Sequence, residues 1–258
     1  MQKRMSLSLL AMLFCLISQP LHATELTVMI SGGFKAAWEK LAPEFAEKQG
    51  ITLKTVPGPS MGKSAEAIPN RLAAGENADV IIMVGDALSD LSRNGMVIAD
   101  TRTELADSRI GVVVSSGKPK PDISTDKTLR SALLEADSIA YSDSASGRYV
   151  QQQLFKKLGI EQQVQGKAHQ VEKTPVALTV AQGHYTIGLQ QVSELLPVPG
   201  VSFVGKIPDN VQYVTRFAGA VAAKTEHAEE AKLLLRYLSS KQVQQTVRAT
   251  GLDSVTTP

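Results

Sequence analysis

Short apolar runs alternate with amphipathic stretches along most of the chain. The first run, 26–30, precedes apolar residues that recur at helical spacing between positions 34 and 45, and the segment 51–56 then alternates as a second strand. The next strand, 78–84, ends in five consecutive apolar residues, as strands buried on both faces do. This order, β-α-β-α-β, predicts a mostly parallel sheet flanked by helices.

A second series of the same kind follows a polar break at 115–121. Apolar runs predict strands at 110–114, 138–141, 185–189 and 211–222, a helix over 149–158, and a last helix built on apolar positions between 231 and 238. We therefore expect two α/β lobes, with 24–110 plus 215–258 forming lobe 1 and 111–214 forming lobe 2. Strands crossing near 109–115 and 211–222 would serve as the hinge. Ligands bind at the carboxyl ends of strands in such sheets, so the cleft between the lobes is the expected site.

The first 23 residues have the layout of a secretory signal peptide. Two basic residues, Lys3 and Arg4, precede an apolar run at 6–18, which is short of the roughly 20 residues that span a bilayer. We expect cleavage near Ala23 and export to the periplasm. This segment holds the single cysteine, two of the 27 basic residues and none of the 25 acidic ones. The remainder is formally neutral and has no thiol, which argues against nucleic acid as a partner and against disulfides.

Small and hydroxyl-bearing residues collect at four predicted strand-to-helix junctions. Helix starts present free N–H groups and the positive end of the helix dipole, so they attract anions. The candidate ligand residues at these junctions are Ser31, Gly32, Gly33, Ser60, Met61, Gly62, Lys63, Ser64, Ser144, Ser146, Gly147, Arg148, Tyr149 and Thr174. Asp86, at the carboxyl end of a strand, is a further candidate, with capping of the next helix as the alternative. Glycines and hydroxyls also cap helices for purely structural reasons, and Thr174 before Pro175 is a favourable capping pair.

Two cations at these junctions give a more specific signal. The stretch 58–64, GPSMGKS, resembles a phosphate-binding loop, but three residues separate its glycines where the nucleotide motif has four. Lys63 and Arg148 lie at helix starts, where a cation is unfavourable by roughly 0.3–1 kcal/mol unless an anion is bound between them. Arginine suits bidentate pairing with a carboxylate or phosphate. Alternatively, both side chains point to water or to local acids such as Glu66 and Asp143.

The chain offers no assembled catalytic group. Ser144 and Ser146 have no histidine nearby and lack the G-x-S-x-G arrangement of serine hydrolases. The histidines at 169, 184 and 227 show no metal-ligand spacing. We therefore expect no metal, no cofactor and no enzymatic activity, and keep a hydrolase using a cleft serine as an alternative.

Several stretches resemble the molybdate-binding periplasmic receptors of ABC importers. They are Ala78-Asp79-Val80-Ile81-Ile82, Gly147-Arg148-Tyr149, the segment 176–180 and Gly188-Leu189. The resemblance extends over nearly all of the chain after residue 23. It implies the type II periplasmic-binding-protein fold, two lobes that close on a small anion, and transient contact with a membrane permease. We expect a monomer.

The departures from that family concern the ligand loops. The first loop is Ser31-Gly32-Gly33-Phe34 where the family tends to have Ala-Ala-Ser, and Gln190 stands where the family has a ligand-binding tyrosine. Lys63 and Arg148 add cations where the family typically binds its oxyanion with neutral donors. These differences favour a di- or tricarboxylate resembling aconitate or citrate, with Gln190 as a further candidate contact. A receptor for molybdate, tungstate or another oxyanion, and a ligand sensor, remain alternatives.

Overall fold

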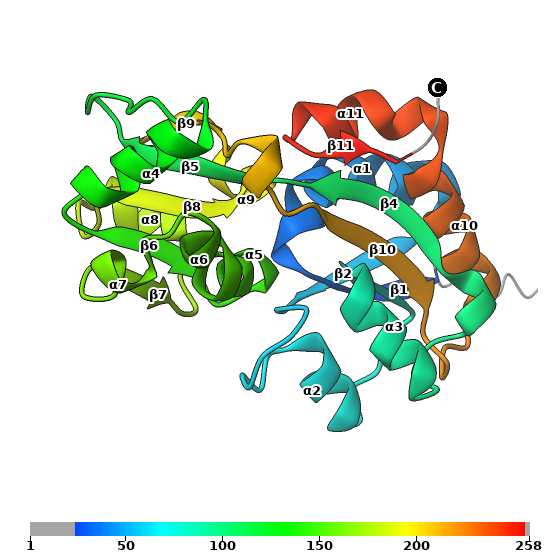
Figure 1. Ribbon diagram of the computed structural model, residues 1–258. Helices are drawn as coiled ribbons and strands as arrows, with labels where there is room; N and C mark the ends of the chain where they lie inside the picture. The colour runs from blue at the N-terminus through cyan, green and yellow to red at the C-terminus, as the bar shows by residue number, and fades with distance from the viewer. Residues whose placement is uncertain (1–23, 256–258) are drawn as a thin grey trace, which may run out of the picture.

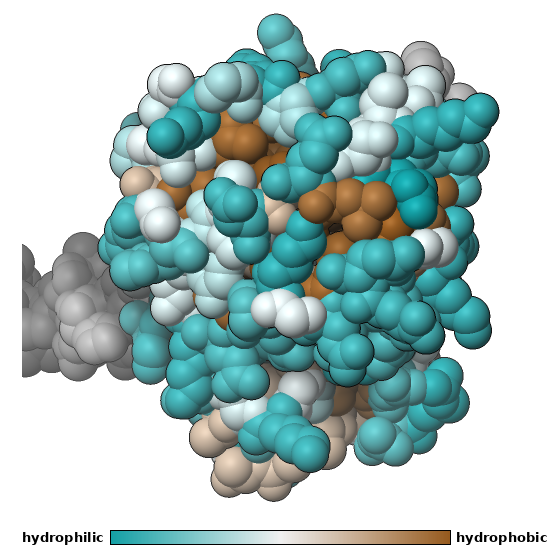
Figure 2. All heavy atoms as spheres, turned by 60° about the vertical axis from the view of Figure 1, so that its left-hand side comes forward, coloured by the Kyte–Doolittle hydropathy of each residue, from teal (hydrophilic) through white to brown (hydrophobic). Residues whose placement is uncertain are grey.

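The computed structural model describes residues 24–255, so the predicted signal peptide lies outside the described residues. These residues form two mixed sheets, each flanked by helices and placed side by side (Figure 1). The two-lobe α/β architecture expected from the sequence is present. Figure 2 shows that the face at the left of Figure 1 is largely hydrophilic, with apolar side chains visible in depressions between polar ones.

The elements have the following bounds. The strands are β1 Glu25–Ile30, β2 Thr52–Pro57, β3 Val80–Val84, β4 Thr103–Ser108, β5 Ile110–Ser115, β6 Ile139–Ser142, β7 Ala168–Val171, β8 Ile187–Gln191, β9 Val201–Lys206, β10 Thr215–Val221 and β11 Asp253–Ser254. The α-helices are α1 Gly32–Gln49, α2 Ile68–Ala73, α3 Gly85–Arg93, α4 Asp126–Glu135, α5 Ala145–Tyr149, α6 Phe155–Lys157, α7 Glu161–Val164, α8 Val176–Ala181, α9 Val192–Leu195, α10 Ala228–Ser239 and α11 Gln244–Ala249. Short 3-10 turns cover Ala99–Thr101, Asp209–Val211 and Lys241–Val243, and Val150–Leu154 is a π-helix.

The two sheets are less parallel than the sequence suggests. The first has the order β11-β4-β10-β3-β1-β2 and the second β7-β6-β8-β5-β9. Parallel pairing is confined to β1 with β2 and β3, and to β6 with β7 and β8. The strands that lead the chain between the lobes, β4, β5 and β10, pair antiparallel with every neighbour, because they enter each sheet from the opposite direction.

Each sheet has its own core. In the first lobe, α1 buries Phe34, Trp38 and Phe45 and contacts β2 and β3, and all five residues of β3 are buried. This helix ends at Gln49 and is followed by Gly50, whose φ of 63° lies in the left-handed region that glycine adopts without strain. The second lobe packs Leu129, Leu154 and other apolar residues around β5, β6 and β8. The apolar spacing in the sequence corresponds to these buried faces.

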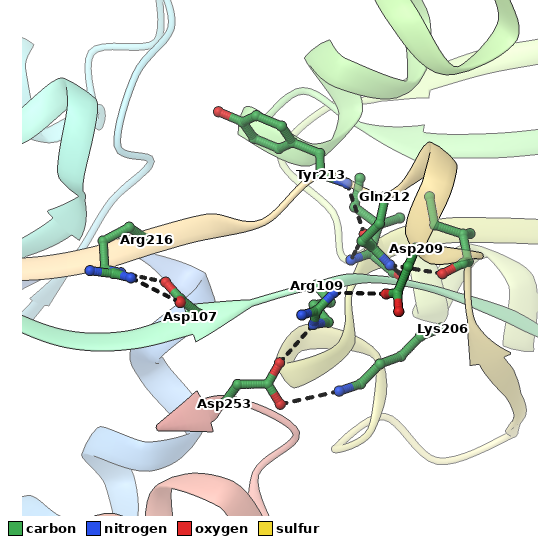
Figure 3. Close-up of polar contacts among 10 residues, drawn as sticks. Asp107, Arg109, Lys206, Asp209, Gln212, Tyr213, Arg216 and Asp253 are labelled. Atoms are coloured by element: carbon green, nitrogen blue, oxygen red, sulfur yellow. Dashed lines mark hydrogen bonds and ion pairs between the residues drawn. The ribbon is translucent and has the colours of Figure 1, made fainter. Parts of the chain in front are cut away.

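Two crossing segments join the lobes (Figure 3). The first passes from β4 to β5 through Arg109, whose guanidinium bonds Asp253 of β11 at 2.9 Å and Asp209 at 3.0 Å. Lys206 of β9 pairs with the other oxygen of Asp253 at 3.2 Å. The C-terminal strand of the first sheet is thus held to the second sheet by ion pairs at the crossing.

The second crossing segment is shorter as a strand than predicted. The sequence predicts one strand over 211–222, whereas β10 begins at Thr215. Gln212 explains the difference, because its side chain accepts from the Ile110 N–H at 2.8 Å and donates to the Ile110 carbonyl at 3.0 Å. The Gln212 side chain thereby bonds backbone groups that a neighbouring strand would otherwise pair. The segment before β10 makes no strand pairing (Figure 3).

The helix predicted over 149–158 is also interrupted. Here α5, the π-helix Val150–Leu154 and α6 follow one another as one irregular helical segment. A π-turn inserts one extra residue per turn and is frequent near functional sites. Gln152 and Gln153, adjacent in this π-turn, both line the cavity described below.

Candidate ligand-binding cleft

A cavity of about 300 Å³ lies between the lobes. The first lobe contributes Met61, Val84, Asp86, Ala87 and Asp90, the second contributes Ala145, Arg148, Tyr149, Gln152 and Gln153, and Tyr213 comes from the crossing segment. The volume is at the small end of the roughly 300–1,000 Å³ typical of ligand pockets, which suits a small metabolite. Four predicted site residues line it: Met61, Asp86, Arg148 and Tyr149.

Arg148 is the cation of this cavity. It lies in α5, is exposed, and forms no ion pair with any of the residues 24–255 that the structure describes. The alternative in which a local acid such as Asp143 neutralises it is therefore not observed. A guanidinium lining an interlobe cavity without a partner is suited to bind an anionic ligand.

Two stacked tyrosines form the wall of the cavity beside the hinge. The rings of Tyr149 and Tyr213 are nearly parallel, with centroids 5.0 Å apart. The Tyr149 hydroxyl donates to the Val211 carbonyl at 2.6 Å and accepts from Lys157 Nζ at 3.1 Å. Burial, and then the nearby Asp86 carboxylate, raises the pKa of Tyr213. The Tyr149 hydroxyl is used within the protein, so this residue offers a ligand its ring.

Three serine hydroxyls cluster where β6 turns into α5. Ser142 Oγ lies 2.7 Å from Ser144 Oγ and 3.2 Å from Ser146 Oγ. The turn is tight, because a side chain at Gly147 would overlap the Ser142 carbonyl oxygen. The predicted residues Ser144, Ser146 and Gly147 thus form one compact turn that leads directly into Arg148.

The first predicted loop lies at the contact between the lobes. Ser31 precedes α1, is 3% exposed, and its Oγ has no hydrogen-bond partner among the residues described. Gly32 lies against the carboxyl group of Glu194 in α9, where a Cβ would overlap Oε1. The Gly33 carbonyl accepts from the hydroxyl of Ser193 at 2.7 Å. The starts of α1 and α9 therefore meet across the lobe boundary.

Glu194 is a partly buried acid at that contact. Its carboxyl accepts a hydrogen bond from the side-chain amide of Gln190, and no described cation pairs with it. Burial raises the pKa of Glu194 to about 7; the Gln190 hydrogen bond opposes this rise and the nearby Asp143 adds to it. The pKa of Asp143 is itself raised by burial. A carboxyl that titrates near neutrality can both accept and donate a proton.

The second predicted loop contributes less to the cavity than expected. Ser60 is buried and its Oγ accepts from the Val84 N–H at 3.0 Å, which fixes the loop to β3. Gly62 has φ 117°, and Ser64 bonds the carboxylate of Glu66, whose pKa is lowered first by that bond. Lys63 is exposed and does not line the cavity. Of this loop, Met61 alone among the predicted residues reaches the cavity wall.

The last two predicted residues are Thr174, which precedes α8, and Gln190 of β8, which bonds the start of that helix. Thr174 is exposed, and α8 begins at Val176 with Pro175 before it, so the prediction that Thr174 caps this helix is wrong. Instead the Val176 N–H donates to Gln190 Oε1 at 3.1 Å. Gln190 is buried and uses its amide nitrogen for Glu194, so it links the start of α8 to the lobe contact.

Sequence reasoning missed Glu194, Tyr213 and the glutamine pair of the π-turn. Glu194 lies four residues after Gln190, one helical turn beyond the end of β8, so it is at the same kind of junction as the predicted loops. That position at a strand-to-helix junction could have identified Glu194 from the sequence.

Within residues 24–255 there is no group of three or more His, Cys, Asp or Glu placed to hold a metal ion. None of the helices described there is both long and apolar enough to cross a membrane.

Two lobes on mixed sheets, joined by two crossing segments around a cavity lined by polar and apolar side chains, are the architecture of a two-lobe ligand-binding protein. The chain belongs to the family of bacterial extracellular solute-binding proteins, whose family model matches residues 26–253. Membership agrees with the predicted resemblance and with an extracytoplasmic protein.

Comparison with individual proteins refines this assignment. A relative from a Pseudomonas species, named aconitate isomerase, is 42% identical over 247 residues, which cover 96% of this chain and 94% of the relative. Among solved structures, the periplasmic molybdate-binding protein of Azotobacter vinelandii is 18% identical, with a TM-score of 0.72 over 90% of this chain and 99% of that one. The substrate-binding domain of a putative molybdenum ABC transporter from Clostridium difficile is 17% identical, with a TM-score of 0.69 over 91% and 100%. These structures confirm the type II periplasmic-binding-protein fold.

The prediction that the protein is not an enzyme is wrong on this comparison. The relative that matches nearly the whole chain at 42% identity is named for an enzymatic activity. The sequence argument failed because it searched for a nucleophile with a base, and an isomerase needs neither a nucleophile nor a metal if one acid–base group can move a proton.

Proposed function

We propose that this protein binds aconitate in the cleft between its lobes and isomerises it. The observation that carries the proposal is the 42% identity, over nearly the full length of both chains, to a relative named aconitate isomerase. The cleft supports it: a cavity of small-molecule size, an unpaired guanidinium, and a lobe contact that includes a protonatable carboxyl suit a tricarboxylate whose isomerisation requires proton movement.

The test is direct. Purified protein is incubated separately with cis-aconitate and trans-aconitate, and proton NMR follows the appearance of the other isomer. We expect conversion from both sides to one equilibrium mixture, and none with heat-denatured protein. Tight binding of molybdate without binding or conversion of aconitate would contradict the proposal and favour an oxyanion receptor.

Family membership supports a second function on the same site. A solute-binding protein delivers its ligand to a membrane permease, and calorimetric binding of aconitate without conversion would favour this role. We also propose that the protein is periplasmic and monomeric after removal of residues 1–23. The family's extracellular description supports export; N-terminal sequencing and sedimentation of the native protein would contradict this picture if they gave an intact N-terminus or an oligomer.

Arg148 provides a test of where the ligand binds. Replacing Arg148 with methionine removes the charge while keeping much of the side-chain length. Because a hydrogen bond to a charged group contributes about 1.5–3 kcal/mol, calorimetry should show a loss of trans-aconitate affinity of roughly 10- to 150-fold. Arg148→Lys should retain part of the affinity, since an ammonium keeps the charge but loses the bidentate fork.

The matched control is Arg236→Met. Arg236 is exposed on α10 and does not line the cavity, so its loss should leave affinity unchanged. Wild-type affinity in Arg148→Met would show that the anion binds outside this cavity.

A further inference from the structure

Glu194 occupies a position that packing alone does not explain. It extends from α9 of the second lobe to the start of α1 in the first, where its carboxyl contacts Gly32, while the neighbouring Ser193 bonds Gly33. The group contacts Gly32 and Gln190, two residues predicted to bind the ligand, and is not itself part of the cavity wall that contains Arg148. A carboxyl taken out of water without a cation is unfavourable, so a purely structural residue at this point would more simply be an amide or an apolar side chain.

The surroundings orient this carboxyl without neutralising it. Gln190 Oε1 accepts from the Val176 N–H, which turns the amide nitrogen of Gln190 toward Glu194. Of the elements packed around the carboxyl, α1 presents neutral glycines, β8 presents neutral Gln190, and the turn after β6 presents the like charge of Asp143. Beside Gly32, the buried Ser31 hydroxyl lacks a partner among the described residues. An unpartnered polar group and an unpaired acid thus lie together at the lobe contact.

The reaction requires a group of this kind. Aconitate carries a carbon–carbon double bond next to a CH₂ group, with carboxylates on all three carbons. A base that removes a proton from the CH₂ carbon leaves an allylic anion delocalised toward the carboxylates. Return of the proton to the former alkene CH carbon moves the double bond, and the product can form with the other geometry. One C–H bond breaks and one forms, no atom is gained or lost, and nothing is oxidised or reduced.

We propose that the Glu194 carboxyl is the acid–base group that carries this proton, with Gln190 as the residue that positions it. This inference rests on the proposed isomerase function. Glu194 takes the proton as a carboxylate and returns it as a carboxylic acid. A pKa of about 7 suits both halves of the cycle near neutral pH.

The first test compares Glu194→Gln with the wild-type protein, using trans-aconitate in D₂O. Wild type should incorporate deuterium into aconitate as it isomerises it. Glu194→Gln keeps the shape of the side chain but cannot carry a proton, so both rates should fall by about 100-fold or more. Binding of trans-aconitate by calorimetry should persist in the variant. Glu135→Gln, at an exposed site on α4, is the matched control and should behave as wild type.

The second test separates chemistry from structure. The hydrogen bond from Gln190 lowers the pKa of Glu194, so Gln190→Met should move the acid limb of the kcat profile to higher pH. An unmoved limb would overturn the assignment, and so would Glu194→Gln turnover within tenfold of wild type. If wild type itself neither converts aconitate nor exchanges deuterium, the proposed function fails and the role of Glu194 fails with it. If wild type is active and Glu194→Gln is equally active, only the role of Glu194 is wrong.

Discussion

Replacing Gly147 with alanine should destabilise the protein by roughly 3 kcal/mol, the upper part of the usual range for overpacked sites. Gly147 lies in the first turn of α5, where a Cβ would overlap the backbone carbonyl of Ser142 at the end of β6. A flexible side chain could rotate away from such an overlap, but a backbone carbonyl in a strand cannot. For a domain of this size the change corresponds to a fall in melting temperature of roughly 6–12 °C, measurable by calorimetry.

The same variant should weaken the ligand site, because the turn that must open also carries Ser146 and Arg148. Gly166→Ala is the matched control: it lies in the same lobe, and a Cβ added there meets no atom within 4 Å. We expect Gly166→Ala to change stability by less than about 0.5 kcal/mol. Equal melting temperatures for the two variants would show that the Ser142–Gly147 turn is not packed as described.

The sequence was sufficient for the lobes because their strands are strongly patterned. The five apolar residues Val80–Val84 and the helical spacing of Phe34, Trp38 and Phe45 report burial directly, and burial follows the period of the element. Sheet direction was less predictable. The apolar pattern of a strand such as β10 is the same whether it pairs parallel or antiparallel. Its direction is set by the path of the chain through the hinge.

The hinge itself depended on single side chains. Gln212 ends strand pairing by bonding the backbone of Ile110, and Arg109 binds Asp209 and Asp253, which lie 100 and 144 residues further along the chain. No local pattern announces such pairs, because each partner looks like an ordinary surface residue in its own segment. Their role appears when both crossing segments are seen together (Figure 3).

At the candidate site, the rule about strand-to-helix junctions selected loops of which only some residues line the cavity. The structure places Arg148 in the cavity wall and leaves Lys63 exposed outside it, although both satisfied the same argument about a cation at a helix start. Glu194 was missed because attention to anion binding favours cations and hydroxyls. The structure places Glu194 at the contact between the lobes, where it is partly buried and pairs with no cation among the residues described.

That acid should make stability depend on pH. The pKa of Glu194 is raised from 4.5 to about 7 by burial. Between these values the folded protein keeps a proton that the unfolded chain has released, so stability falls as pH rises through this window. Above pH 7 the folded protein holds the carboxylate in its unfavourable site and the whole loss is present. One pKa unit corresponds to about 1.4 kcal/mol, which gives a total loss of about 3 kcal/mol, an upper value because the carboxyl is partly exposed.

Glu194→Gln isolates this contribution, because all other groups titrate in both proteins. Urea unfolding of the ligand-free protein is measured from pH 4.5 to 8. As the pH rises, the free energy of unfolding of the variant should increase relative to that of wild type by up to about 3 kcal/mol, with the change centred between pH 4.5 and 7. Glu135→Gln should follow wild type at every pH. A constant difference between Glu194→Gln and wild type would mean that the carboxyl ionises as it does in water. Burial that favours the protonated form of Glu194 must also make the folded protein less stable when Glu194 is ionised. A constant difference would therefore show that this burial, and the raised pKa that suits Glu194 to exchange a proton near neutral pH, are absent.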